Sequence, residues 1–388
     1  MVRKQKLVGL LLTATLLVSP VTALATGQNQ LPDPETYAKE VPISAQEAAV
    51  IDVKSGRILY EKNADKKTLI ASTTKVITAI VAIESGKLND TVTISPNAAR
   101  QEGSSIYLEP GEKYKLIDLV YGMMLRSGND AATAIAEYVG GSVEGFAEKM
   151  NALVEKLGLK ETHFANPHGL DHPEHYSSAH DMAVLTAYAL RNPIFQEIVS
   201  TKFKTIPWPG KEWDRKMKNK NKMLDRYDGA DGVKTGYTKK SGRCLISSAT
   251  RDGRQIAVVV LNDPNDWNDS AHLLDYGFSK YKFETLAGPS TVVKTLPVSR
   301  GEATTVAIVS KSTVQYPIRT DEQNSVTRQI DLPASLAAPV RVGRPVGTMN
   351  VFLHNQKLAS VELIPQVPVS DIGFWKTLQQ LLHVMFTN

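Results

Sequence analysis

Short apolar runs bounded by turn residues mark several strands in the first three-quarters of the chain. Residues 48–53 and 57–60 are two such runs, and they flank a Lys-Ser-Gly turn, which predicts a β-hairpin. Three later runs, at residues 233–237, 244–249 and 256–261, are joined by short turns that contain glycine. Runs of this length with such turns predict an antiparallel meander.

Helical patterns fill the region between these strands. Apolar residues lie all around a helix over residues 72–83, which predicts that this helix is buried on every side. A second helical stretch covers residues 116–125, breaks at residues 127–129, and resumes from Asp130, which suits an N-cap position. Strands, then helices, then strands is the order of an α+β fold, in which helices flank an antiparallel sheet.

The pattern changes beyond residue 282. Short β-rich runs there alternate with Pro and Gly, and residues 354–357 read as the turn of a hairpin that leads into residues 358–364. We therefore predict a first, α+β domain over residues 46–282 and a small all-β domain over residues 283–366.

The last segment, residues 367–388, has the pattern of an amphipathic helix. Its apolar face holds Phe374, Trp375, Leu378, Leu381, Leu382 and Met385, and its polar face holds Lys376, Gln380, His383 and Thr387. The segment is too polar to span a bilayer but suits a helix that lies in the membrane interface. A helix that docks on the protein's own domains is the alternative.

The first 25 residues have the layout of a secretory signal peptide. A basic start is followed by an apolar run at residues 7–18 and by Ala-Leu-Ala at residues 23–25, a small-x-small cleavage pattern. The apolar run is shorter than the ~20 residues that span a membrane, so we expect cleavage and export rather than an uncleaved anchor. Residues 26–45 then form a leader or linker. Together with the amphipathic tail, this predicts an extracytoplasmic protein peripheral to the outer face of the cell membrane.

Composition excludes several classes of protein. With 388 residues, 42% of them hydrophobic, and a net charge of only +5, the chain is not disordered. Cys244 is the only cysteine, so the chain holds no internal disulfide. A mean hydropathy of -0.20 argues against a polytopic membrane protein. No basic stripe interleaved with aromatic residues stands out, so nucleic acid is not an expected partner.

The first candidate catalytic residues lie at the start of the helix that is predicted to be buried. Ser72 and Lys75 are three residues apart and therefore share a helix face, so that the lysine can reach the serine hydroxyl. A serine becomes a useful nucleophile beside a base, and a lysine is such a base when burial or a neighbouring cation lowers its pKa. The pattern is weak alone, because residues 279–282 match it too.

Two further motifs make the set specific. Ser127 and Asn129 form a Ser-x-Asn pattern in the loop between two predicted helices, and Lys234, Thr235 and Gly236 form Lys-Thr-Gly on a predicted strand. A closely similar trio, in this order, is typical of penicillin-binding proteins and class A β-lactamases.

The chain resembles the low-molecular-mass penicillin-binding proteins, which are serine-type D-alanyl-D-alanine carboxypeptidases. The resemblance runs from about residue 48 to residue 281. It is carried by five strings: residues 71–75 (ASTTK), 126–132 (RSGNDAA), 166–170 (NPHGL), 176–183 (YSSAHDMA) and 231–238 (DGVKTGYT). It implies a catalytic domain like that of the serine β-lactamases and penicillin-binding proteins over residues 46–282.

The resemblance also implies an acyl-enzyme route. Ser72 would attack the carbonyl between the two terminal D-alanines of a peptidoglycan stem peptide, and Lys75 would take the hydroxyl proton. Lys234 would help to keep Lys75 neutral, since like charges disfavour double protonation. Ser127 would relay a proton toward the leaving D-alanine. Penicillin and other β-lactams would acylate the same serine.

The remaining motif residues would bind the substrate. The resemblance implies that Asn129 holds a substrate amide and that Thr235 binds the terminal carboxylate. Gly236 would let the peptide lie against the strand as an added strand. The backbone N–H groups of Ser72 and Tyr237 would form the oxyanion hole. No cofactor and no metal are implied.

The sequence departs from relatives at two places. Tyr237 stands where some relatives carry His. Residues 262–269 are acidic and lack the arginine with which some relatives grip the substrate carboxylate, so we expect Lys220 or another cation to take that role.

Three alternatives remain at this point. A β-lactamase would need a glutamate to activate water, and no Glu-x-x-Leu-Asn string follows the Ser-x-Asn loop. A non-catalytic wall-binding protein would not need the six intact polar side chains of the motifs. A zinc peptidase is suggested by five of the eight histidines, which cluster as His163, His168, His172, His175 and His180. No His-Glu-x-x-His string accompanies them, and loop and cap roles are the competing explanation.

Overall fold

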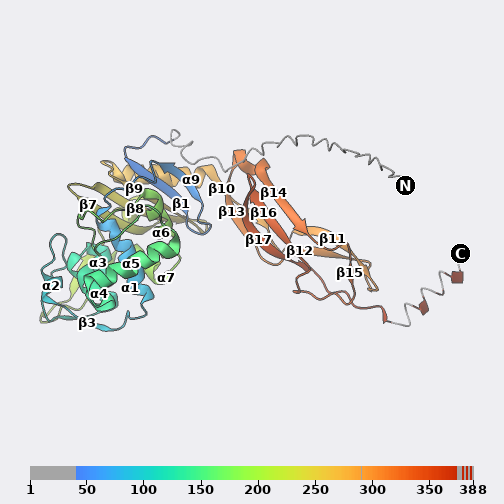
Figure 1. The fold of residues 1–388 in the computed structure, drawn as a ribbon, viewed down its shortest axis with the longest axis horizontal. Coiled ribbons are helices and arrows are strands. Elements are labelled where there is room, and N and C mark those ends of the chain that lie inside the picture. The colour runs from blue at the N-terminus through green and yellow to red at the C-terminus, as the bar shows by residue number, and fades with distance from the viewer. Residues whose placement is uncertain (1–40, 290, 374–377, 380–381, 383–384, 387–388) are drawn as a thin grey trace, which may run out of the picture.

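The computed structural model describes residues 41–289, 291–373, 378–379, 382 and 385–386. Two bodies lie end to end (Figure 1): a first domain that combines a sheet with helices, and a second domain built of strands. The predicted α+β fold with a C-terminal all-β domain is confirmed. The predicted signal peptide and ten of the 22 residues of the predicted amphipathic tail lie outside the described residues.

A five-stranded antiparallel sheet organises the first domain. Its strands lie in the order β2-β1-β9-β8-β7. Their bounds are β1 (Glu47–Asp52), β2 (Ile58–Lys62), β7 (Ala230–Thr238), β8 (Gly242–Arg251) and β9 (Arg254–Leu261). The predicted hairpin and meander are thus both present, and strand β7 forms one edge of the sheet. One side of β7 therefore has no strand partner among the described residues and is open to a substrate.

Helices cover both faces of this sheet, and the alternation of side chains along β9 shows why. Ala257, Val259 and Leu261 face the larger core beneath the main group of helices. Ile256 and Val258 face a second core beneath α9 (Asp266–Lys280). The main group comprises α1 (Lys75–Glu84), α3 (Leu116–Arg126), α4 (Asn129–Gly140), α5 (Val143–Leu157), α6 (Ala179–Leu190) and α7 (Pro193–Ser200). As predicted, α1 is buried on nearly all sides.

Helix α4 has its N-cap two residues earlier than the sequence predicted. Its N-cap is Gly128, and its first residue is Asn129, so the expectation of an Asp130 N-cap is wrong. The Asp130 carboxylate instead accepts the backbone N–H groups of Ile106 and Leu108. The same carboxylate also accepts the backbone N–H of Ala131, so it binds both the neighbouring loop and the first turn of its own helix.

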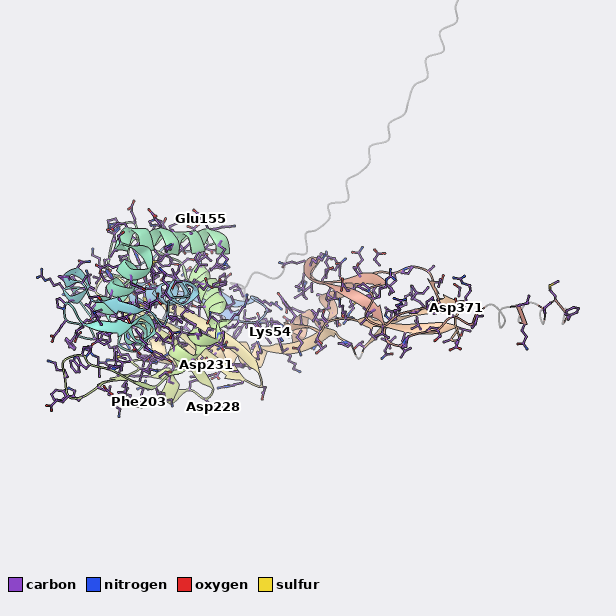
Figure 2. The ribbon with its side chains drawn as sticks, turned by 90° about the horizontal axis from the view of Figure 1, so that it is seen from below. Lys54, Glu155, Phe203, Asp228, Asp231 and Asp371 are labelled. Carbon is purple, nitrogen blue, oxygen red and sulfur yellow. The ribbon has the colours of Figure 1, made fainter. Side chains whose placement is uncertain are left out.

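Shorter elements complete the first domain. They are η2 (Ala71–Thr74), β3 (Thr91–Thr93), α2 (Pro96–Ala99), β4 (Lys113–Lys115), β5 (Phe203–Ile206), β6 (Arg215–Lys218) and α8 (Met223–Arg226). Strands β5 and β6 pair as a hairpin. In Figure 2, Phe203 of this hairpin and Glu155 of α5 lie at opposite sides of the domain.

The second domain has two sheets around its own apolar core, and all their strand pairs are antiparallel except β11 with β15. Strands β10 (Tyr281–Ala287) and β13 (Val314–Arg319) form one sheet. The other sheet has the order β14-β16-β17-β12-β11-β15. Its strands are β11 (Val292–Ser299), β12 (Thr305–Ser310), β14 (Val326–Asp331), β15 (Leu336–Ala337), β16 (Gly347–Leu353) and β17 (Gln356–Pro365), and η3 (Thr320–Ser325) precedes β14. The predicted turn falls at His354 and Asn355, both with positive φ.

A buried arginine holds the two domains together. Arg57, beside β2, donates from Nη1 to the carbonyl oxygen of Pro317 at 2.5 Å and forms an ion pair with Glu322. Its guanidinium also lies 5.1 Å from the ring centroid of Tyr281.

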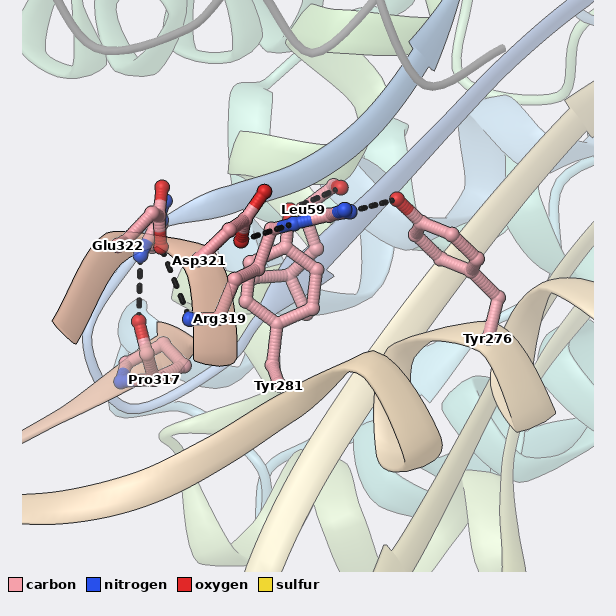
Figure 3. Close-up of polar contacts among 8 residues, drawn as sticks. Leu59, Tyr276, Tyr281, Pro317, Arg319, Asp321 and Glu322 are labelled. Atoms are coloured by element: carbon pink, nitrogen blue, oxygen red, sulfur yellow. Dashed lines mark hydrogen bonds and ion pairs between the residues drawn. The ribbon is translucent and has the colours of Figure 1, made fainter. Parts of the chain in front are cut away.

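Two tyrosines extend this contact, as Figure 3 shows. The Tyr281 hydroxyl donates to the carbonyl oxygen of Leu59 at 2.7 Å, and Arg319 donates to the Tyr276 hydroxyl at 2.8 Å. Several polar groups thus fix the orientation of the second domain on the first. Within the described part of the chain, no helix combines the length and apolar character needed to cross a membrane.

Candidate active site

Ser72 lies in a tight turn immediately before α1. This turn, η2, begins with Ala71 at a φ of 48°, a left-handed conformation that is costly for a residue with a side chain. Hydroxyl groups hold the turn: Thr73 donates to the carbonyl oxygen of Ile70 at 2.6 Å, and Thr74 donates to that of Ala71 at 2.8 Å. The turn leaves Ser72 partly exposed while its neighbours are buried.

Lys75 is fully buried and lies against Ser72. Its Nζ is 2.9 Å from Ser72 Oγ, 2.7 Å from Asn129 Oδ1 and 2.7 Å from the carbonyl oxygen of His168. The serine and lysine predicted to share a helix face therefore meet directly. Asn129, from the predicted Ser-x-Asn loop, completes the contact.

The left-handed backbone conformation of Ser127 brings the Ser-x-Asn motif next to the Lys-Thr-Gly motif. Ser127 has a φ of 65° at the end of α3, which turns its side chain toward β7. Lys234 on β7 donates from Nζ to Ser127 Oγ at 3.1 Å and to the carbonyl oxygen of Thr235 at 2.8 Å. The three motifs, which are far apart in the sequence, thus converge on one place.

Strand β7 passes very close to the serine turn at Gly236. A Cβ at this position would lie 3.1 Å from the backbone nitrogen of Ser72. The N–H of Thr238 points toward the β8 side, where it donates to Ser241 Oγ. Because successive N–H groups alternate along a strand, the N–H of Tyr237 points to the open side, toward Ser72.

Burial and neighbouring cations lower the pKa of both motif lysines. Desolvation is the main cause of the low pKa of Lys75, which lies well below its usual value, and the charges of Lys234 and Lys220 add to the effect. Desolvation also lowers the pKa of Lys234 to about 7, with a smaller contribution from Lys220. Neither lysine has a carboxylate partner among the described residues.

The site opens into a cavity of about 600 Å³. Its lining includes Ser72, Ser127, Thr235, Gly236 and Tyr237 among the predicted residues, with Lys75, Asn129 and Lys234 buried behind them. The rest of the lining is Ser104, Lys220, Lys222, Arg243, Asp266 and Trp267. All eight predicted site residues are therefore brought together.

Comparison with known proteins identifies the family. Residues 34–265 match the family model described as D-alanyl-D-alanine carboxypeptidase, and residues 281–370 match the model described as penicillin-binding protein 5, C-terminal domain. The chain belongs to the D-alanyl-D-alanine carboxypeptidase family. Its function as a serine-type carboxypeptidase of cell-wall metabolism, and its place among the low-molecular-mass penicillin-binding proteins, are as the sequence predicted.

Relatives match along nearly the whole chain. The D-alanyl-D-alanine carboxypeptidase DacF of Bacillus subtilis is 32% identical over 90% of this chain and 94% of its own length. DacC of Escherichia coli is 31% identical over 91% and 93%. Among solved structures, penicillin-binding protein 5 of Haemophilus influenzae is 32% identical, with a TM-score of 0.67 and coverage of 85% of this chain and 98% of that one.

Arg243 is a cavity residue of this carboxypeptidase that the sequence did not reveal. It lies on β8 opposite Tyr237, and its guanidinium forms an ion pair of 2.9 Å with Asp266 at the start of α9. The cation expected near the acidic stretch therefore has two candidates, Arg243 and Lys220. The strand register was the missing signal, because only pairing with β7 brings Arg243 to the cavity.

The acidic stretch itself has a structural role. Asp263 and Asp269 are buried and accept hydrogen bonds from Ser44, at 2.9 Å from its hydroxyl and 2.5 Å from its backbone nitrogen. These contacts tie the segment before β1 to α9. Of this stretch, Asp266 and Trp267 line the cavity.

The clustered histidines serve the loop that supports the serine turn. His175 Nδ1 accepts the backbone N–H of Ala165 at 3.2 Å, so its Nε2 carries the proton and donates to Thr74 Oγ1 at 2.8 Å. Burial lowers the pKa of His175 and of His168 to about 3 in each case. Where the chain is described, no three His, Cys, Asp or Glu side chains gather as metal ligands.

Cys244 is buried on β8, as expected of a small strand residue. Desolvation raises the pKa of its thiol to about 11, so the thiol is neutral near pH 7. It is therefore no rival to Ser72 as nucleophile.

Proposed function

We propose that Ser72 is the nucleophile of this carboxypeptidase and that neutral Lys75 is its base. One arrangement carries the proposal. A neutral amine has two N–H groups and one lone pair, and Asn129 Oδ1 and the carbonyl oxygen of His168 each take one N–H of Lys75. The lone pair is then left for the Ser72 hydroxyl at 2.9 Å.

The reaction follows from these contacts. Ser72 Oγ attacks the carbonyl carbon of the penultimate D-alanine while its proton passes to Lys75. The tetrahedral intermediate collapses, the C–N bond breaks, and the nitrogen of the terminal D-alanine takes up, through Ser127, the proton that Lys75 received. Water then hydrolyses the ester, releases the shortened peptide and restores Ser72.

The open edge of β7 supports the binding mode. A stem peptide that adds to this edge as a further strand brings its carbonyl oxygen between the N–H groups of Ser72 and Tyr237. A side chain at Gly236 would crowd the serine turn, because its Cβ would lie 3.1 Å from the backbone nitrogen of Ser72. Asn129 would hold a substrate amide, and Thr235, beside Lys220 and Arg243, would take the terminal carboxylate.

Release of D-alanine from a peptide that ends in D-Ala-D-Ala tests the assignment. Ser72→Ala and Lys75→Ala should each lower kcat by at least a thousandfold, because the nucleophile and its base act as a unit. A Lys75→Ala enzyme with undiminished kcat would rule out the lysine as base.

We further infer that the protein is exported and lies on the outer face of the cell membrane through its C-terminal helix. The signal-peptide pattern and the amphipathic pattern of residues 367–388 support this placement. Leu382, Met385 and Phe386, where described, are exposed rather than docked on a domain.

Flotation with lipid vesicles tests this placement. The chain should float with vesicles, whereas a chain that ends at residue 366 should remain in the soluble fraction. Equal flotation of both would refute the role of the helix.

A further inference from the structure

A strongly basic segment leads into the active-site cavity. Residues 202–222 hold eight lysine or arginine residues against two acidic ones, in a chain whose net charge is only +5. The segment forms the hairpin of β5 and β6 and the link from β6 to α8. Much of the positive charge of the molecule is therefore concentrated beside the site.

Four lysines of this segment form one exposed row. From residue 215 to residue 223 exposed positions alternate with positions that are buried or half-buried, and every exposed position is a lysine: Lys216, Lys218, Lys220 and Lys222. We call these four residues the lysine row. Lys216 and Lys218 lie in β6, where side chains two residues apart point to one side, ~7 Å from each other, and Lys220 and Lys222 follow the end of the strand. Lys220 and Lys222 line the cavity, so the row runs from the hairpin into the site.

An exposed aromatic ring lies within the outer half of the row. Phe203 is 55% exposed and is paired with Lys218 across the hairpin. Its ring centroid lies 5.7 Å from Lys216 Nζ and 5.6 Å from Lys218 Nζ. Contact with the ring restricts both ammonium groups, which lowers the entropic cost of binding an anion.

The lysines of the row form no ion pair within the described chain. None of its four lysines has a salt-bridge partner among the residues that the structure describes, whereas nearby Lys202 is paired with Asp225 at 2.9 Å. A line of unpaired cations attracts and orients anionic ligands, and its effect decreases with salt.

We propose that the outer half of the lysine row, Lys216 and Lys218 with Phe203, binds carboxylates of stem peptides next to the one being cut. This inference rests on the proposed function. The stem in the site ends at its terminal D-alanine, beside Thr235 and Lys220. Lys216 lies in β6, four residues before Lys220, and does not line the cavity, so the end of this stem does not reach it. An anion there must come from a neighbouring stem, which makes polymeric, uncross-linked peptidoglycan the preferred substrate class.

The sequence did not reveal this surface, and no basic stripe with aromatic residues was expected. Phe203 is thirteen residues from Lys216 in the chain. The hairpin register alone brings the ring between the two lysines.

Binding to polymeric peptidoglycan tests the proposal without catalysis. In a full-length Ser72→Ala background, K216Q/K218Q should weaken co-sedimentation with uncross-linked peptidoglycan by about tenfold at low salt, and added salt should remove the difference. K149Q/K160Q is the matched control, because it removes the same charge from exposed positions on and just after α5, which lies across the domain from Phe203. The control should bind like the parent.

Kinetics with two substrates give the second readout. In the otherwise wild-type enzyme, K216Q/K218Q should lower kcat/KM for the polymer and leave kcat/KM for a short acylated D-Ala-D-Ala peptide unchanged. An equal loss on both substrates, or none on the polymer, would overturn the proposal. The proposal would also be overturned if the lysine row binds a phosphodiester polymer but not peptidoglycan. If no enzyme form releases D-alanine, the proposed function fails, while the sedimentation result still decides the surface.

Discussion

At the scale of single residues, Lys75 and Lys234 are two lysines that are buried in the same site. Each loses most of its hydration, and the charge of Lys234 lowers the pKa of Lys75 further. Lys220 adds its charge from the rim of the cavity. The pH range in which Lys75 acts as a base therefore depends on a residue that does not touch it.

Replacement of Lys220 should shift the pH profile. The charge of Lys220 lowers the pKa of Lys75, so Lys220→Gln raises that pKa. Since Lys75 must be neutral to accept a proton, the acid limb of the penicillin acylation rate should move to higher pH. Lys222→Gln, which also removes a cavity cation, is the control and should move the limb less. An unchanged or lowered limb in Lys220→Gln would contradict the account.

Burial of neutral His175 should make the free energy of unfolding depend on pH in the acid range. Its pKa is about 3 in the native state against 6.5 for the ordinary side chain. Above pH ~6.5 the ring is neutral in both states. Between pH ~6.5 and ~3 only the unfolded chain binds the proton, so the free energy of unfolding falls as pH falls, by up to ~4 kcal/mol.

Urea unfolding at several pH values measures this effect. The decrease between pH 6.5 and pH 4 should be smaller in His175→Gln than in the parent. His272→Gln, at an exposed position on α9, should keep the parental slope. Identical slopes in all three proteins would refute a neutral His175.

At the scale of elements, the loop after α5 supports the serine turn by close contact. Gly169 has a φ of 87°, and a Cβ there would lie 1.9 Å from the carbonyl oxygen of Ala71. Gly158 also has a positive φ, of 69°, but a Cβ there would meet no atom within 4 Å. A side chain at Gly158 would therefore add backbone strain alone, whereas a side chain at Gly169 would add a steric clash as well.

Alanine at these glycines should have unequal effects. Gly158→Ala should cost about 1 kcal/mol of stability, the strain of a left-handed alanine, and leave acylation by penicillin intact. Gly169→Ala should cost more and slow acylation, because the serine turn must move. Thermal unfolding and acylation rates measure both, and equal effects of the two variants would argue against the contact.

Local sequence patterns predicted the helices and strands, whereas contacts between elements determined which further residues reach the cavity and the lysine row. Strands β1, β2, β7, β8 and β9 were predictable because their side chains record burial locally. The motif residues were predictable because their spacing is characteristic of a family. Arg243 reaches the cavity, and Phe203 the lysine row, only through strand register, and Asp130 binds a loop that lies more than twenty residues away in the chain. Such contacts leave no periodic signal in the sequence.

At the scale of the whole molecule, Arg57 determines how the two domains are joined. It is buried, and its ion pair with Glu322 crosses the boundary. Removal of one member of a buried pair leaves the other uncompensated, which typically costs ~3–5 kcal/mol. The active site is formed by the first domain alone, so its chemistry should not depend on this contact.

Glu322→Ala should therefore loosen the second domain without affecting acylation. Proteolysis between the domains should become faster, and penicillin should still acylate the protein at the parental rate. Glu362→Ala is the control, because Glu362 forms an ion pair with Lys311 within the second domain. Both side chains of this pair are exposed, and exposed ion pairs contribute little to stability. Slower acylation in Glu322→Ala would show that the domains are coupled in catalysis.

The position of the acyl group tests the central assignment most directly. The full chain should be treated with penicillin and its intact mass measured, with the modified residue then located by peptide mapping. We predict a single adduct on Ser72, absent from Ser72→Ala and retained in Ser279→Ala, which alters the other Ser-x-x-Lys match. An adduct on any other residue, or an adduct that persists in Ser72→Ala, would contradict the account.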